Sequence, residues 1–260
     1  MLETWRAPAG RRGVIGIAVI VTVVLLTLPA GASAVGRAVN GQPVAKPYFD
    51  SRVGAGRAAE RRGSVGTRSE RAARSRLRAR LGRQAVVQVD ALTGTARTVQ
   101  RLDGTLTGPA AGDRAAIAMS WLRANRAALG VTAADLDATT VADRKVDQGT
   151  GFTYLRYRQS YRGIPTFDGG LRVNLDRGGR ILNVTGAPIS GLSVPSVTPK
   201  LSAVDAMRAL QRNVGVTRAI DVTSGPAGTR QMTRLARGDF ARLVLFDGPD
   251  GVRLAWHLTY

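Results

Sequence analysis

The sequence has no cysteine and a single histidine, His257, among its 260 residues. Without cysteine the chain cannot form disulfides, use a thiolate nucleophile or bind a metal through sulfur. With one histidine it cannot build a site that needs two imidazoles, such as the two-histidine zinc helix of metalloproteases. A Ser/His/Asp triad would have to use His257. We therefore expect no catalytic residue, cofactor or metal in this chain.

Negative charge is also scarce, because 38 lysines and arginines face 18 aspartates and glutamates and the formal net charge is +20. All but three of the basic residues are arginine, in a chain rich in alanine, glycine and valine, as GC-rich coding sequences produce. The charge is therefore weak evidence for a nucleic-acid partner. A hydrophobic fraction of 44% is enough for a core, and the length predicts one or two domains.

Residues 1–34 have the order of a secretory signal peptide. Three arginines precede an uncharged run at 14–28, which is followed by Pro29 and by Ala-Ser-Ala at 32–34. A helix over that run would span about 22 Å, less than the ~30 Å of a bilayer core. We expect cleavage after Ala34 and a secreted, extracellular protein whose only membrane contact is through this segment. An uncleaved anchor is the alternative.

Residues 35–83 are predicted to form a basic linker. Eleven arginines and two glutamates lie between positions 51 and 83, and large apolar residues are rare, so this stretch cannot bury enough surface to order itself. One helix is predicted at 69–81, with Ser69 as its N-cap and Gly82 as its end. We expect it to be solvated or loosely docked. The functional alternative is an electrostatic contact with an acidic partner surface.

Beyond residue 83 the periodicity predicts an α+β fold of antiparallel curved sheets, each packed by a helix. The predicted strands are 84–90, 96–102, 152–161, 171–175, 180–184, 241–246 and 252–260, and the predicted helices are 114–129, capped by Asp113, and 203–214, capped by Ser202. The acid pairs Asp135/Asp137 and Asp247/Asp250 are assigned to loops and turns rather than to catalysis.

The run at 159–171 reads Gln-Ser-Tyr-Arg-Gly-Ile-Pro-Thr-Phe-Asp-Gly-Gly-Leu, and a hairpin loop at 176–179 and a returning Val-Thr-Gly at 184–186 follow it. This pattern resembles the fungalysin/thermolysin propeptide motif (FTP). Its glycines permit a tight bend and a close approach of strands, and its proline restricts the preceding residue to extended geometry. None of its residues is reactive, so the motif shapes a scaffold. We take as its structural residues Gln159, Tyr161, Gly163, Ile164, Pro165, Phe167 and Gly170.

The resemblance covers about residues 48–260. It implies an FTP-like domain at 84–198, a PepSY-like module at 199–260 that is truncated at its C-terminal end, and a linker that belongs to the pro-region. In that family the pro-region inhibits a secreted zinc metallopeptidase and acts as its intramolecular folding chaperone. The implied partner is the catalytic domain, in cis in a longer precursor or in trans. Zinc is expected only in that domain, which is missing here.

The departure from the family is the absence of a catalytic domain, since one histidine cannot supply the zinc ligands. We expect the chain to be the N-terminal part of a truncated precursor. One alternative is a free-standing secreted protease inhibitor. Another is a basic surface or nucleic-acid-binding protein that uses the arginine segment, which is disfavoured because that segment has no interleaved aromatic residues to stack on bases.

Overall fold

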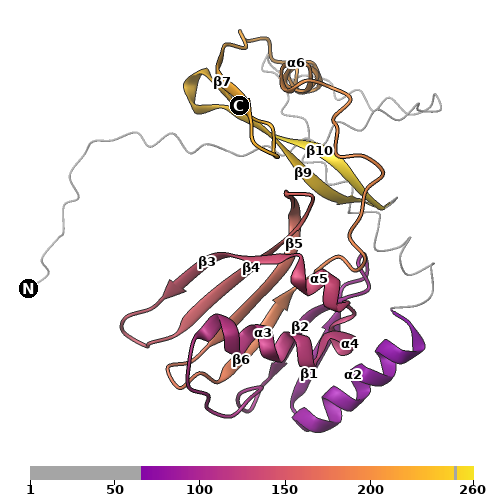
Figure 1. Ribbon diagram of the computed structural model, residues 1–260, viewed down its shortest axis with the longest axis vertical. Helices are drawn as coiled ribbons and strands as arrows, with labels where there is room; N and C mark the ends of the chain where they lie inside the picture. Colours follow the sequence, from indigo (N-terminus) through magenta and orange to yellow (C-terminus); the bar gives the residue numbers. More distant parts are fainter. Residues whose placement is uncertain (1–65, 249–250) are drawn as a thin grey trace, which may run out of the picture.

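The computed structural model describes residues 66–248 and 251–260 and shows an α+β protein with one large open sheet and a few helices (Figure 1). The predicted signal peptide, its cleavage after Ala34 and most of the predicted linker lie outside the described residues. None of the helices within the described ranges is long and apolar enough to cross a membrane.

The elements alternate between helices and antiparallel strands. The helices are α2 (Arg68–Leu81), α3 (Arg114–Ala124), α4 (Arg126–Leu129), α5 (Ala133–Asp137), α6 (Ala203–Val214) and the short 3-10 helix η1 (Ala236–Gly238). The strands are β1 (Ala85–Val89), β2 (Ala96–Arg101), β3 (Thr139–Val146), β4 (Thr153–Tyr161), β5 (Ile164–Leu175), β6 (Ile181–Gly186), β7 (Val222–Ala227), β8 (Met232–Leu235), β9 (Phe240–Gly248) and β10 (Gly251–Thr259).

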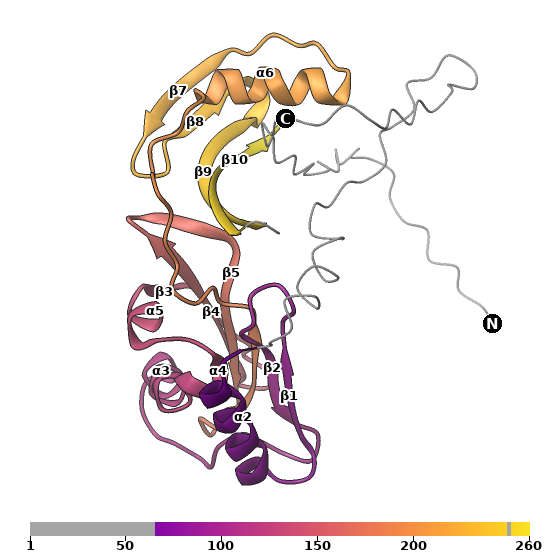
Figure 2. The same ribbon diagram turned by 90° about the vertical axis from the view of Figure 1, so that its right-hand side faces the viewer.

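The first half of the sheet pairs β1, β2, β6, β5, β4 and β3 in antiparallel order. One row of side chains crosses it, because residues directly opposite each other in neighbouring strands point to the same face. That row is Val87, Val99, Val184, Val173 and Leu155, all buried. Figure 2 shows the helices α2 to α5 on this side of the sheet. The first core therefore lies between these helices and the aliphatic rows.

The second half consists of β7, β8, β9 and β10 with α6 packed over it (Figure 2). Met207 and Leu210 of α6 are fully buried against Ala241 and Leu258 of the β9–β10 hairpin. Ser202 caps α6 as predicted, since its hydroxyl accepts a hydrogen bond from the Asp205 N–H at 3.1 Å. The sequence predicted a separate sheet packed by a helix here; the helix is present, but the strands belong to one large sheet.

The two halves are not separate sheets, because β5 takes part in both. It pairs with β4 at both ends and with β6 in its C-terminal part, and Thr166 near its start pairs in parallel with Leu245 of β9. Ten strands therefore form one sheet. The sequence predicted a break at 163–165 and a strand only from 171. The structure corrects this, because the extended geometry that Pro165 imposes on Ile164 is itself compatible with a strand.

Several short elements have no equivalent in the sequence prediction. Strand β3 is an edge strand whose residues are almost all exposed, and β7 is exposed throughout, so neither shows the alternation that marks a half-buried strand. The predicted helix 114–129 is interrupted at Asn125, whose side-chain amide donates to the carbonyl of Trp121 at 2.8 Å. The backbone of Asn125, with φ −111° and ψ 13°, lies outside the α-helical range and ends α3 there.

Helix α2 differs from the predicted helix at 69–81 in its cap and in its docking. Its N-cap is Thr67, in a reciprocal capping box with Glu70, rather than Ser69. The helix is not loosely docked, because Leu77 and Leu81 are buried in the first core.

The feature that docks α2 is the side chain of Arg74, which is only 3% exposed. Its Nε donates to the carbonyl of Ala128 at 3.1 Å and its Nη2 to the carbonyl of Gly94 at 2.8 Å. Burial is the largest cause that lowers the pKa of Arg74, and Glu70 opposes it. These bonds satisfy a guanidinium that would otherwise be costly to bury, and so they tie α2 to the β1–β2 turn and to the end of α4.

We predict that Arg74→Met destabilises the protein, because two carbonyls lose a charged donor at about 1–3 kcal/mol each. The matched control is Arg76→Met on the same helix, where the side chain is exposed. Urea unfolding followed by circular dichroism measures both. Equal unfolding midpoints for the two variants would show that Arg74 does not dock the helix.

Candidate functional site

The motif at 159–171 forms the hairpin between β4 and β5. Tyr161 pairs with Ile164, so the turn consists of Arg162 and Gly163 alone. Both turn residues have positive φ, 49° and 79°, as a two-residue type I′ turn requires. The guanidinium of Arg162 lies 5.4 Å from the centre of the Tyr161 ring. This hairpin places the motif at the junction of the two halves of the sheet (Figure 2).

Gln159 is a buried polar residue of the motif, with 1% of its surface exposed. Its Nε2 donates to the carbonyl of Ile189 at 2.8 Å, and its Oε1 accepts from the Ile189 N–H at 2.7 Å. Ile189 lies where the chain leaves β6 on its way to α6. The amide therefore fastens the connection between the halves to β4, with both backbone groups of Ile189 satisfied.

Thr166 was not among the residues singled out from the sequence, although a hydroxyl within an Ile-Pro-Thr-Phe run was a signal. It is buried, and its Oγ1 donates to the carbonyl of Gly169 at 2.7 Å. Gly170 pairs with Arg158 across the hairpin, where a Cβ would overlap the carbonyl oxygen of Tyr157. The close approach of β4 and β5 therefore requires glycine at this position.

The remaining motif residues divide between the two sides of β5. Ile164 is buried with Val194, Leu243 and Leu245, and half-buried Tyr161 packs against this cluster. On the other side the ring of Phe167 lies 6.2 Å from that of Phe246 and 5.3 Å from that of His257. Pro165 is buried as well. The motif thus supplies apolar contacts to both faces of the second half.

His257 on β10 contacts both aromatic and positively charged side chains. Its ring meets Phe167 and Phe240 edge-on, and its Nδ1 accepts a hydrogen bond from Nε of Arg242 at 3.1 Å. Burial lowers the pKa of His257, and the positive charges of Arg242 and Arg230 lower it further. The neutral imidazole with its proton on Nε2 is therefore the favoured form.

Arg158 of β4, Arg230 of the β7–β8 turn and Arg242 of β9 form what we call the arginine cluster. Burial is the main cause that lowers the pKa of Arg230 and of Arg242, and the charges within the cluster add to it. The Nε of Arg230 is buried without a hydrogen-bond partner. Within the described part of the chain no carboxylate forms an ion pair with any of the three.

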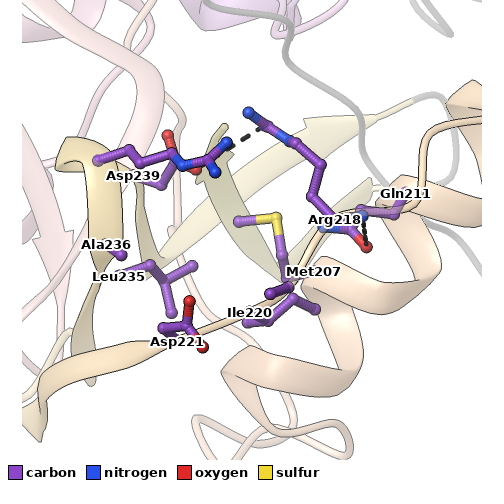
Figure 3. A pocket seen from close by; sticks show the side chains of 10 residues that line it. Met207, Gln211, Arg218, Ile220, Asp221, Leu235, Ala236 and Asp239 are labelled. Atoms are coloured by element: carbon purple, nitrogen blue, oxygen red, sulfur yellow. Dashed lines mark hydrogen bonds and ion pairs between the residues drawn. The ribbon is translucent and has the colours of Figure 1, made fainter.

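Two hollows lie near these elements. One, beneath α6, is lined by Met207, Ile220 and Leu235 and is crossed by an ion pair between Arg218 and Asp239 at 3.8 Å (Figure 3). Its volume of about 20 Å³ leaves room for one water, so it is a packing gap. The other, of about 90 Å³, lies between the β1–β2 turn, β5 and β9 and is lined in part by Phe167 and Asp168.

Over residues 66–248 and 251–260 no three His, Asp or Glu side chains lie close enough together to hold a metal ion. The acid pair predicted in a loop at 135 and 137 lies in α5 instead. There the Asp135 carboxylate accepts from the Thr132 and Gly191 N–H groups, at 2.8 and 2.9 Å. Sequence reasoning missed this because a capping role depends on where the helix begins.

Residues 137–188 match the family model of the Fungalysin/Thermolysin Propeptide Motif. This match confirms the resemblance seen in the sequence, and it indicates a propeptide of a fungalysin/thermolysin-type metallopeptidase. Such a motif implies association with a metallopeptidase catalytic domain. No curated protein matches the chain. The PepSY-like assignment of 199–260 stays a prediction.

We predict that Gln159→Leu destabilises the protein, because the buried N–H and carbonyl of Ile189 each lose their partner at about 1–3 kcal/mol. Gln88→Leu is the matched control, since Gln88 is exposed on β1 and its replacement should change the free energy of unfolding by no more than about 0.5 kcal/mol. Urea unfolding and amide exchange at Ile189 measure the effect. Unchanged exchange at Ile189 in Gln159→Leu would contradict the clamp.

We predict that His257 makes the protein less stable in mild acid. Its pKa in the folded state lies below the ordinary 6.5, so well above pH 6.5 it is neutral in both states and contributes nothing. As the pH falls from 6.5 towards the folded-state pKa, the unfolded chain binds the proton first and the free energy of unfolding decreases. His257→Gln should lack this decrease between pH 7 and 5. A free energy of unfolding that increases in the wild type as the pH falls from 7 to 5 would contradict the prediction.

Proposed function

We propose that this chain is the pro-region of a secreted, fungalysin-like zinc metallopeptidase, which inhibits the catalytic domain and assists its folding. The observation that carries the proposal is the match of residues 137–188 to the propeptide motif. Secretion is part of the proposal and is supported by the signal-peptide pattern at 1–34.

The contacts of the motif favour a role that depends on shape. Gln159, Thr166 and Gly170 are used to hold β4, β5 and the connection to α6 together. A scaffold fixed in this way loses little conformational entropy when it binds, and so it can present one surface to a folding catalytic domain. Assistance in folding then follows from binding the native form of the enzyme better than its unfolded form. Inhibition follows when the bound surface covers the substrate cleft of the enzyme.

Open strand edges offer one mode of binding. Within the described residues β10 pairs only with β9, and β3 pairs only with β4. The outer edge of each strand carries backbone N–H and carbonyl groups that a strand of the catalytic domain can pair with. Binding through the backbone requires no reactive side chain, which agrees with a motif that contains no reactive residue.

The test uses purified fungalysin-type and thermolysin-type catalytic domains. We predict that the full chain inhibits peptide hydrolysis by at least one of them, and that it raises the yield of active enzyme when the denatured catalytic domain is refolded. A serine protease serves as the specificity control and should be unaffected. Unchanged activity and unchanged refolding yield with both metallopeptidases would refute the proposal.

A further inference from the structure

We propose that the arginine cluster binds a carboxylate side chain of the metallopeptidase catalytic domain. This inference rests on the proposed function and deepens it, because it assigns the contact that gives the pro-region its electrostatic specificity. The cluster lies at the junction of the two halves. There the Thr229 hydroxyl of the β7–β8 turn donates to the carbonyl of Gly163 at 3.2 Å, and the Leu243 N–H of β9 donates to the carbonyl of Arg230 at 2.7 Å.

The cluster is assembled by tertiary structure from three separate elements. Arg158 stands on β4 opposite Gly170 of the motif, and Arg230 is held by the bond from the Leu243 N–H to its carbonyl at 2.7 Å. Arg242 is held by His257 and by the ring of Phe240, 5.0 Å from its guanidinium carbon. The positive charges are therefore brought together by positioned backbone and rings, at a fixed place on the protein.

Three positive charges held close together repel one another, and this arrangement is unfavourable unless an anion binds to them. Some other arginines of the described chain do have a carboxylate partner, as Arg101 does with Asp103 at 3.0 Å and Arg144 with Asp113. The cluster has no such partner among the described residues, and partial burial strengthens the repulsion between its members. A carboxylate bound beside the three guanidinium groups would offset the repulsion between them.

The geometry of Arg242 suits a carboxylate in particular. Its Nε is engaged by His257, and no hydrogen bond from its two terminal nitrogens is found within the described residues. Those nitrogens can form the two-pronged contact that guanidinium groups make with carboxylates. A nucleic acid is less well suited, because base stacking needs an open aromatic face, whereas the rings of Phe167 and Phe240 pack edge-on against His257.

The single histidine makes a direct experiment practical, because its ring protons give an unambiguous NMR signal in the full chain. The probe is the peptide acetyl-Glu-Glu-Glu-amide, titrated to millimolar concentration, with acetyl-Gln-Gln-Gln-amide as the neutral control. An anion bound beside Arg242 should raise the pKa of His257 by about 1, in a saturable way. No saturable change with the glutamate peptide would overturn the proposal.

The variant for this experiment combines Arg230→Gln with Arg242→Gln and should abolish the saturable response. Because it removes repelling charges, it should unfold at the same or a higher denaturant concentration than the wild type. Should it fail to fold, the single variant Arg158→Gln takes its place, with a weakened response expected. The control is Arg208→Gln on α6, where the side chain pairs with Asp205 at 3.2 Å and the response should be unchanged. A full response in the folded double variant would overturn the proposal.

Inhibition of the catalytic domain separates this inference from the proposed function. The double variant should need at least about tenfold more protein than the wild type for half-inhibition, and Arg208→Gln should match the wild type. If wild type and double variant inhibit equally, the inference is overturned and the proposed function stands. If the wild type does not inhibit, the proposed function fails and the peptide titration alone decides whether the cluster binds a carboxylate.

A single-stranded oligonucleotide that shifts the His257 signal at lower concentration than the peptide would overturn the proposal in favour of a nucleic acid.

Discussion

The pair of hydrogen bonds between the amide of Gln159 and the backbone of Ile189 is the contact on which the arrangement of this protein depends. Ile189 begins the connection that carries the chain from the first half of the sheet to α6, and Gln159 lies on the strand that leads into the motif hairpin. A buried amide is stable only when both its donor and its acceptor are satisfied. The clamp therefore specifies one position of the connection relative to β4.

Strand β5 extends the effect of this clamp to the second half. It pairs with β4 at both ends, with β6 at its C-terminal end and with β9 near its start, so the two cores share a backbone element. The residues that allow the crossing are a buried hydroxyl, Thr166, and a glycine, Gly170, at a point of close strand approach. The propeptide motif is thus a structural joint, and its chemistry is hydrogen bonding and packing.

The same joint concentrates positive charge. Arg158, Arg230 and Arg242 come from distant parts of the sequence and meet there without a carboxylate among the described residues. Isolated arginines are expected in a chain with a net charge of +20, but partly burying the charges of these three is unfavourable in free energy. Under the proposed function this cost has a use, because the anion that relieves it belongs to the catalytic domain.

Local sequence patterns determined much of this protein. The strand pairs β1–β2 and β9–β10, the helix α6 with its Ser202 cap and the propeptide motif all follow from periodicity, caps and turn residues within short windows. The exposed strands β3 and β7 escaped prediction because they carry no buried face. Only the tertiary structure decided that Arg74 docks α2, that β5 joins both halves and that Arg158, Arg230 and Arg242 come together. These outcomes depend on partners up to 84 positions away, as between Arg158 and Arg242, and a local pattern carries no information about which distant carbonyl, strand or charge will face a given side chain.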